Sequence, residues 1–296
     1  MKPSAHGLDD KNVYNMAVVK DNGTFSMIYR GESKAEDKNE CTGRLFLATS
    51  TDGVHFSRNE APVFVGSESY ESHGVEDPRI VKVGGTFYMT YSGYDGHIAR
   101  LCLATSTDLR NWDKLGPMFP KFPAGPNGRF SEDWTKSGAI LPEKLTSGRF
   151  AGEYVMVFGD TDLWLAHSKD MTHWDYLPDP VLRTRPEHHD RALVEPGPPL
   201  MLTKQGILLL YNSADEHNHY AMMGALFDAQ DPTKLKKRLD LPFLEPTLNW
   251  EKTGYVPHVV FGEALIHDGD HWNLYYGGAD HQIGLARAPF DPALLP

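Results

Sequence analysis

Four consecutive residues bring together side chains that suit acid–base chemistry. Glu76, Asp77, Pro78 and Arg79 supply two carboxylates, a rigid ring and a cation, and they lead directly into the apolar pair at 80–81. Charged side chains are rarely buried without partners, so charges gathered at the start of an apolar strand indicate a site that faces a cavity. Pro78 disfavours helical backbone at Asp77 and predicts an extended, fixed residue there. A salt-bridged turn before a strand is an equally good interpretation of these residues alone.

A repeated unit of three strands positions these residues. Each unit consists of an inner strand, an aromatic strand and a partner strand, and three of the partner strands continue into a turn with an aspartate. Five such units with only weak helical periodicity predict an all-β fold, a five-bladed β-propeller. No linker divides the chain, so residues 1–296 are predicted to form a single propeller domain. The inner strands are predicted at 13–20, 75–83, 137–144, 193–203 and 256–267, and the aromatic strands at 24–30, 86–92, 153–159, 206–212 and 272–277.

The inner strands of a propeller line its central channel, so their polar residues should converge with those of the loops after the aromatic strands. Carboxylates accept hydrogen bonds from sugar hydroxyls, and aromatic faces cover the C–H surface of a sugar ring, so the predicted pocket suits a carbohydrate. For each loop aspartate taken singly, a role in the turn is the alternative. The predicted substrate-binding residues are Asn15, Arg30, Arg44, Glu76, Arg79, Tyr94, Asp95, Lys144, Asp160, Asp215, His258 and Asp280.

The composition argues against several other classes of protein. The formal net charge is -11 without a basic cluster, which argues against a nucleic-acid partner. No segment approaches the ~18 apolar residues of a membrane helix, and residues 1–10 contain no apolar run of the signal-peptide type. A cytoplasmic protein is therefore expected, and a secreted protein whose signal peptide has been removed is the alternative. Histidines at 188–189 and 217–219 lack a third metal ligand with a clear geometric tie, and no Gly-rich phosphate loop is present. No metal site and no cofactor are therefore predicted.

Five stretches, in order, resemble glycoside hydrolase family 130. They lie at 74–79 (GVEDPR), 85–91 (GTFYMTY), 139–144 (AILPEK), 195–199 (EPGPP) and 277–280 (GGAD), and the resemblance covers essentially the whole chain. It implies a five-bladed β-propeller that acts on β-mannosides with inversion, either as a phosphorylase or as a hydrolase. It also implies that Asp77 is the general acid, which protonates the leaving oxygen directly or through a sugar hydroxyl.

The residues at the end of the third aromatic strand indicate whether phosphorolysis or hydrolysis is to be expected. Phosphorylases need a cationic pocket for phosphate, and the resemblance implies a His-Arg pair where this chain has Phe158, Gly159 and Asp160. Lys144 matches a phosphate-contacting lysine of the family, and Arg100 is a less certain match. We therefore expect an inverting hydrolase of β-linked mannosides, with β-1,2-mannosides as its substrates. The alternatives are an inverting β-mannoside phosphorylase that releases mannose 1-phosphate and a non-catalytic sugar-binding propeller.

A hydrolase also needs a second carboxylate as its base. Glu143, on the predicted inner strand beside that of Asp77, is the first candidate, and Glu195 is the second. Inverting enzymes hold their two carboxyl groups ~6.5–9.5 Å apart, so we predict that Glu143 lies at this distance from Asp77. The expected partner is a mannose-containing oligosaccharide. Inorganic phosphate would be a second substrate only if the enzyme is a phosphorylase, and Lys144 and Arg100 would then bind the phosphate.

Overall fold

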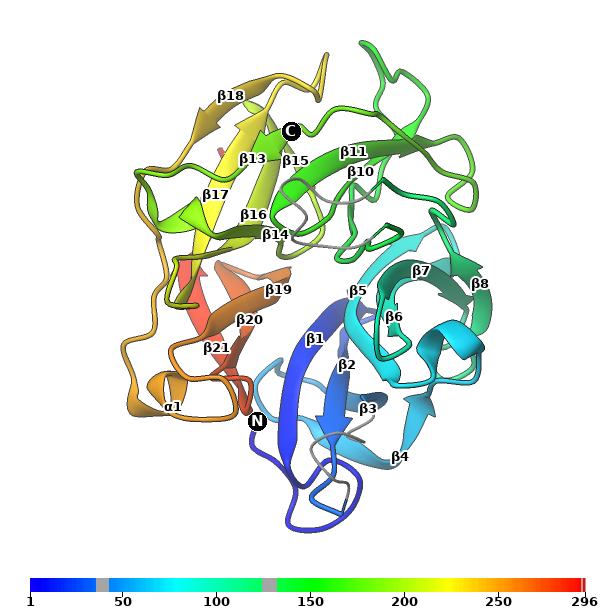
Figure 1. Cartoon of the computed structure of the whole chain (residues 1–296), viewed down its shortest axis with the longest axis vertical. Helices are drawn as coiled ribbons and strands as arrows, with labels where there is room; N and C mark the ends of the chain where they lie inside the picture. The colour runs from blue at the N-terminus through cyan, green and yellow to red at the C-terminus, as the bar shows by residue number, and fades with distance from the viewer. Residues whose placement is uncertain (36–42, 124–131, 294, 296) are drawn as a thin grey trace.

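The computed structural model describes residues 1–35, 43–123, 132–293 and 295. Within these residues almost all regular structure is β-strand, and the strands form five separate sheets. Figure 1 shows the five sheets arranged like blades around one axis, in the order in which they occur in the chain. The predicted all-β, five-bladed propeller is confirmed.

The blades are antiparallel sheets, and the inner strands β1, β5, β14 and β19 lie nearest the centre of Figure 1. Blade one holds β1 (Asn12–Asp21), β2 (Thr24–Glu32), β3 (Arg44–Ser50) and β4 (Ser57–Phe64). Blade two holds β5 (Gly74–Val83), β6 (Thr86–Tyr94), β7 (Ala99–Ser106) and β8 (Asp113–Pro117). Blade three holds β9 (Ala139–Ile140), β10 (Tyr154–Phe158), β11 (Asp162–Ser168), β12 (Asp175–Tyr176) and β13 (Leu182–Arg183). Blade four holds β14 (Leu193–Pro196), β15 (Met201–Thr203), β16 (Gly206–Ala214), β17 (Tyr220–Phe227) and β18 (Leu235–Arg238). The short helix α1 (Asn249–Lys252) follows. Blade five holds β19 (Val260–Asp268), β20 (His271–Gly278) and β21 (Gln282–Pro289).

A buried tyrosine–carboxylate pair recurs in four of the blades. In each, a tyrosine of the aromatic strand donates its hydroxyl hydrogen bond to a carboxylate in the segment that leads into the inner strand. Hydrogen bonds to charged groups contribute about 1.5–3 kcal/mol each, so these pairs anchor each blade to its own first strand. Blade three has the buried Phe158 at the equivalent position. The pairs and their oxygen–oxygen distances are Tyr29–Asp9 (2.8 Å), Tyr91–Glu71 (2.6 Å), Tyr211–Asp190 (2.7 Å) and Tyr276–Glu251 (2.7 Å).

Bulges interrupt the inner strands of blades one, two and five at polar residues. The pairing registers shift at Asn15 in β1, at Asp77 and Pro78 in β5, and at Glu263 in β19. Asn15 and Asp77 have φ angles of 39° and 52°, in the left-handed region that non-glycine residues rarely adopt. A bulge re-aims a side chain and commonly lies beside an active site. The prediction of an extended Asp77 is therefore wrong, because the bulge overrides the preference that Pro78 imposes.

The third inner strand is much shorter than the sequence predicts. β9 contains only Ala139 and Ile140, and its pairing with β10 ends before Pro142, which has no N–H to donate. The residues at 143–144 lie on an exposed turn. The predicted continuation of this strand to residue 144 is therefore wrong.

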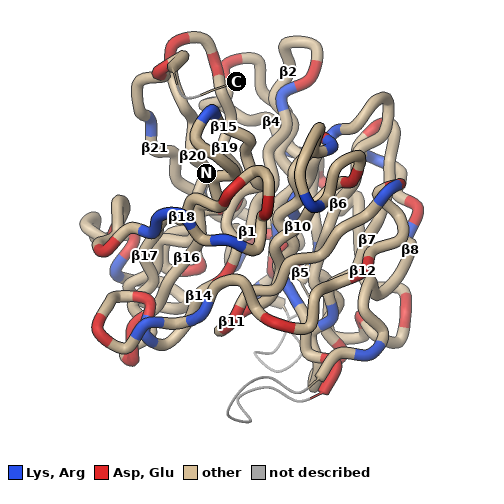
Figure 2. Tube along the Cα trace, turned by 90° about the horizontal axis from the view of Figure 1, so that it is seen from above, with Lys and Arg blue, Asp and Glu red and all other residues tan. Residues whose placement is uncertain are grey.

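The charged residues are spread over the whole propeller. Figure 2 shows Lys and Arg interspersed with Asp and Glu along the described trace, in agreement with the lack of a basic cluster in the sequence. Among the described residues, no helix combines the length and the apolar character that crossing a membrane requires.

Candidate active site

The inner strands meet around a pocket of about 270 Å³. Four carboxylates and two cations line it, and aromatic rings form much of the remaining wall. The sequence predicts this mixture of acids and rings for a carbohydrate site. The lining residues are Tyr14, Asn15, Arg30, Glu76, Asp77, Lys136, Glu195, Tyr220, Tyr255, Val256, Val259, Phe261 and Asp280.

Asp77 lies almost fully buried at the bulge of β5, in the pocket wall. Its Oδ2 atom is 3.1 Å from the Lys136 Nζ atom and accepts a hydrogen bond of 3.2 Å from the Ser92 hydroxyl. The Arg79 guanidinium donates to the backbone carbonyl of Asp77 over 3.0 Å. Burial raises the pKa of the Asp77 carboxyl, but the positive charges of Lys136, Arg79 and Arg30 outweigh burial and lower this pKa below its ordinary value. Asp77 is therefore ionised in the free protein at neutral pH.

Glu195, on β14, is the second carboxylate that Lys136 contacts. Its Oε1 atom is 3.3 Å from the Lys136 Nζ atom and accepts a hydrogen bond from the Ser137 hydroxyl. Burial lowers the pKa of Lys136, but Asp77 and Glu195 raise it well above its ordinary value, so the bridging ammonium stays charged. The two bridged oxygens cannot lie farther apart than their two contacts with Nζ allow. Because these contacts are 3.1 Å and 3.3 Å long, the two bridged oxygens lie closer together than the ~6.5–9.5 Å spacing of inverting glycosidases.

A second cluster of charged side chains, around Arg30, lies in the same pocket as Asp77, Lys136 and Glu195. The Arg30 Nη2 atom is 2.8 Å from the Glu32 carboxylate and 3.0 Å from the Glu76 carboxylate, and the guanidinium lies over the Tyr14 ring at 4.7 Å. Burial raises the pKa of Glu76, the Arg30 charge opposes this, and the Asp77 charge adds to it. Adjacent carboxyl groups whose pKa values are pushed in opposite directions are typical of acid–base sites.

Asp280 brings a further carboxyl group to the pocket from the turn after β20. Its backbone has a φ angle of 50°, in the left-handed region. Burial raises the pKa of Asp280 to about 7; the Arg30 charge opposes this, and the charges of Asp77 and Glu32 add to it. This group therefore changes its charge near neutral pH, inside the pocket.

The raised pKa of Asp280 predicts a pH-dependent stability. Between the ordinary carboxyl pKa of 3.8 and about 7, the folded protein keeps a proton that the unfolded chain has lost, so stability falls as pH rises through this window. The full shift corresponds to at most about 4 kcal/mol. Urea unfolding at about pH 5 and pH 8 should therefore show a smaller loss of stability in Asp280→Asn than in the wild type. An identical pH dependence in both proteins would contradict this account of Asp280.

Arg79 lies beneath the pocket rather than in its wall. Only 2% of its surface is exposed, and its guanidinium donates to the backbone carbonyls of Asp77, Pro196 and Gly197. These contacts tie blade two to blade four directly beside Glu195. The structure gives Arg79 a positioning role in place of the predicted substrate contact, because its donors are used within the protein.

Several predicted substrate-binding residues serve the surrounding loops and lie outside the pocket wall. Asp95 accepts hydrogen bonds from the backbone at 97–98 and pairs with Arg100 at 2.6 Å. Asp215 accepts hydrogen bonds from the backbone N–H groups of residues 217 and 219, which is the turn role considered above. The structure does not bring these side chains to the pocket. The others outside the wall are Arg44 at the start of β3, Tyr94 with its hydroxyl on the Gly96 carbonyl, Asp160 beside Trp134, and His258 against the His219 ring at 4.7 Å.

Glu143 and Lys144 are exposed on the turn after β9, away from the residues that line the pocket. The Lys144 ammonium donates to the Lys169 carbonyl over 2.7 Å and lies 5.2 Å from the centre of the Tyr154 ring. The structure does not bring the predicted base Glu143 or the predicted ligand Lys144 to the pocket wall, because the inner strand ends before both residues. Glu195, the second candidate for the base, does line the pocket.

The sequence does not single out Lys136, the cation that joins the two carboxylates. Lys136 precedes the short strand β9, and no periodicity or spacing marks it. Tyr14 precedes Asn15 on a predicted inner strand, where neighbouring side chains point to opposite faces, and only the bulge at Asn15 brings both to the pocket. Tyr220 and Tyr255 reach the pocket from a strand end and from a loop, so only the tertiary structure reveals them.

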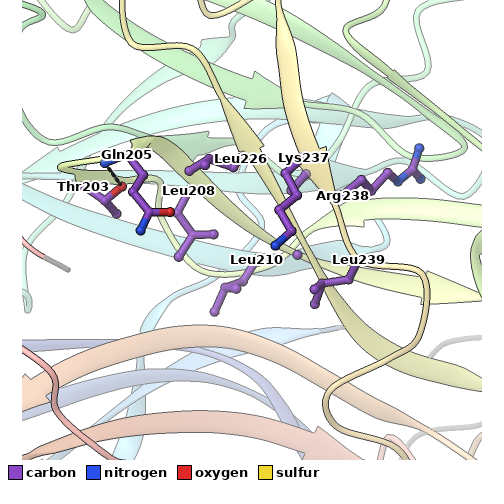
Figure 3. A pocket seen from close by; sticks show the side chains of 10 residues that line it. Thr203, Gln205, Leu208, Leu210, Leu226, Lys237, Arg238 and Leu239 are labelled. Carbon is purple, nitrogen blue, oxygen red and sulfur yellow. Dashed lines mark hydrogen bonds between the residues drawn. The ribbon is translucent and has the colours of Figure 1, made fainter. Parts of the chain in front are cut away.

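Two other hollows, on blades four and five, are mainly apolar. Figure 3 shows one of them, where leucine side chains of blade four lie beside Lys237 and Arg238. No carboxylate lines either hollow, so neither offers an acid–base pair. Among the described residues, no group of three or more His, Cys, Asp or Glu side chains is arranged to hold a metal ion.

Comparisons of sequence and structure relate the chain to known carbohydrate-active enzymes. The model of glycoside hydrolase family 130, described as β-1,4-mannooligosaccharide phosphorylase, matches residues 7–294. A 1,2-β-oligomannan phosphorylase from Thermoanaerobacter sp. (strain X514) is 38% identical over 93% of this chain and 88% of its own length. The β-1,2-mannobiose phosphorylase from Listeria innocua, solved as a complex with β-1,2-mannobiose, is 26% identical with a TM-score of 0.82, over 98% of this chain and 92% of its own.

A further solved structure has a TM-score of 0.85 at 34% identity, and the match covers 99% of this chain and 93% of its own. It is described with the statement that the GH130 family of mannoside phosphorylases contains glycoside hydrolases that target β-1,2 mannosidic linkages in Candida mannan. The family match spans almost the whole chain, and the solved relatives share its propeller fold. The chain therefore belongs to glycoside hydrolase family 130, a family of enzymes that act on glycosidic bonds.

Proposed function

We propose that this protein hydrolyses β-1,2-linked mannosides with inversion, with Asp77 as the general acid and Glu195 as the general base. The observation that carries the proposal is the pair of buried carboxylates joined by the Lys136 ammonium in an acid-rich pocket. A sugar-binding module needs no acid–base pair, so this arrangement favours an enzyme that breaks the glycosidic bond. The β-1,2 linkage is supported by the relatives, whose names and descriptions refer to β-1,2-linked mannosides.

The reaction would use the two carboxyl groups on opposite faces of the anomeric carbon. Asp77 gives a proton to the glycosidic oxygen, directly or through a sugar hydroxyl, while the bond from that oxygen to the anomeric carbon breaks. Glu195 takes a proton from water, whose oxygen forms the new bond to the same carbon. The hydroxyls of the bound mannose would be held by Arg30, Glu76 and Asp280, and the tyrosine rings would cover its C–H surface.

The charge balance of the pocket favours water over phosphate as the attacking group. Lys136 and Arg30, the two cations of the pocket wall, already contact two carboxylates each. A phosphate dianion would have to displace a carboxylate from one of these cations, and it would then face the remaining acids at close range. Water carries no charge and avoids both costs.

Phosphorolysis is the second candidate, because it is the activity named for the relatives. Two relatives from Thermoanaerobacter, at 38% and 33% identity, are a 1,2-β-oligomannan phosphorylase and a β-1,2-mannobiose phosphorylase. In that case Lys136 and Arg30 would hold the phosphate, and Glu195 would orient the lysine. Asp77 would keep its role as the acid.

The linkage and the stereochemistry can be tested together. Purified protein is incubated with the methyl glycosides of β-1,2- and β-1,4-mannobiose, so that all free mannose comes from the non-reducing end. NMR identifies its anomer before the two forms equilibrate. We expect turnover of the β-1,2-linked substrate with α-mannose as the first product. β-Mannose as the first product would contradict inversion, and no product with or without phosphate would favour the sugar-binding module.

A further inference from the structure

Glu263 is a fully buried carboxyl group behind the pocket, at the bulge of β19. It is not among the residues that line the pocket. The Asn15 side-chain amide donates to its Oε2 atom over 3.2 Å, and the Arg79 Nη2 atom lies 3.5 Å from its Oε1 atom. Both neighbours come from the bulged inner strands of other blades, so Glu263 lies where blades one, two and five meet.

The two neighbours of Glu263 extend to the proposed catalytic groups. Asn15 lines the pocket, and its Oδ1 atom accepts a hydrogen bond of 3.4 Å from Arg30. Arg79 donates to the backbone carbonyl of Asp77 and to those at 196–197, which directly follow Glu195. Through Arg79, Glu263 is therefore one contact away from the strands that carry both proposed catalytic carboxylates.

The surroundings of Glu263 favour a neutral carboxyl group. Its Oε1 atom has no hydrogen-bond partner among the described residues. Burial raises the pKa of Glu263 well above its ordinary value; the Arg79 charge opposes this, and the charges of Asp77 and Glu195 add to it. A neutral carboxyl group still offers an oxygen that accepts the hydrogen bond from Asn15. Because it carries no charge, it leaves the positive charge of Arg79 free to act on Asp77.

We propose that Glu263 is a neutral positioning residue of the catalytic pocket. Its carboxyl group accepts a hydrogen bond from Asn15 and packs against the Arg79 guanidinium, and it lies outside the pocket wall. Through Arg79 it fixes the β5 bulge that carries Asp77 relative to the end of β14 that carries Glu195. This role rests on the proposed function, which assigns Asp77 and Glu195 as acid and base. The shape of Glu263 and its hydrogen bond from Asn15 are required, and a negative charge is not.

Two substitutions separate shape from charge. Glu263→Gln keeps the size and the neutral state, so its kcat should stay within about twofold of the wild-type value. Glu263→Leu removes both contacts, and the resulting misplacement of the pocket should lower kcat by about 10–100-fold while KM changes less than about threefold. Glu71→Gln is the matched control, because Glu71 is also a buried glutamate but contacts Tyr91 away from the pocket. Its kcat should stay close to the wild-type value.

Infrared difference spectra test the charge state without turnover. The spectrum of the wild type minus that of Glu263→Gln, at about pH 8, should contain the band of a protonated carboxyl group. Absence of this band would overturn the proposal. So would a loss of kcat in Glu263→Gln as large as that in Glu263→Leu, or a wild-type kcat in folded Glu263→Leu.

Circular dichroism would reveal whether Glu263→Leu folds. If it does not fold, the infrared spectra and the kcat of Glu263→Gln still test the proposal. Failure of the proposed function would look different. A wild-type protein without activity on any β-mannoside would remove the roles of Asp77 and Glu195, whereas the infrared band would still report the state of Glu263.

Discussion

The Asp77→Asn variant is expected to lose about 10²–10⁴-fold in kcat on a β-1,2-linked mannoside, because the amide cannot give a proton to the leaving oxygen. Its oxygen can still accept the hydrogen bonds that Ser92 and Lys136 make with the carboxylate, so the fold should be retained. The loss should be much smaller on a dinitrophenyl β-mannoside, whose leaving group needs no proton. Initial rates on the two substrates, together with thermal unfolding, separate a catalytic effect from a structural one.

Asp108→Asn is the matched control within the same blade. Asp108 accepts hydrogen bonds from the backbone at 110–111 in the exposed turn between β7 and β8, outside the pocket wall. Its kcat should therefore stay close to that of the wild type on both substrates. If Asp77→Asn matched this control on the substrate that needs protonation, Asp77 would not be the acid.

In the proposed mechanism, Asp77 acquires its proton when the substrate binds. Although burial raises the pKa of Asp77, the nearby cations Lys136, Arg79 and Arg30 hold it low in the free protein. A sugar that draws Lys136 away from Asp77 would remove the largest of the charges that lower this pKa, which would shift Asp77 toward the protonated form.

The Glu195→Ala variant is expected to lose about 10²–10⁴-fold in kcat and to regain part of it when azide or formate is added. A small anion can occupy the space of the missing carboxylate and act in its place. Glu195→Gln should lose a similar factor without this rescue, because the amide fills the space and is not a base. Rates measured with and without the anion, on protein shown to be folded, provide the test.

Glu143→Gln is the control for this experiment. Glu143 belongs to the same AILPEK stretch that resembles the family, yet it is exposed on a turn away from the pocket. Its kcat should be unchanged. If Glu143→Gln lost most of its kcat while Glu195→Ala stayed active, Glu143 and not Glu195 would be the base.

The fold could be predicted because it is encoded in a local repeat. Each aromatic strand is a short run of apolar and aromatic residues between turn residues, a pattern that does not depend on the rest of the chain. β2 and β6 begin at the predicted residues 24 and 86 and extend two residues beyond the predicted ends. Five such repeats can bury both faces of every sheet by packing around one axis, which is the propeller arrangement.

The site could be predicted only in part, because its decisive features are not local. The bulge that turns Asp77 into the pocket depends on how β5 pairs with β6, and the sequence alone favoured an extended residue there. Arg79 reaches carbonyls that lie 117 and 118 residues away, so its buried role has no signal in neighbouring residues. Lys136 becomes a bridge only because blades two and four place Asp77 and Glu195 on either side of it.

The most direct test of hydrolysis compares the products formed from β-1,2-mannobiose with and without inorganic phosphate. We expect mannose as the product in both cases, at a rate that phosphate does not raise, because both cations of the pocket wall are already shared by carboxylates. The contradicting result is mannose 1-phosphate, formed at a rate that rises many-fold with phosphate. Lys136 and Arg30 would then form the anion site of a phosphorylase.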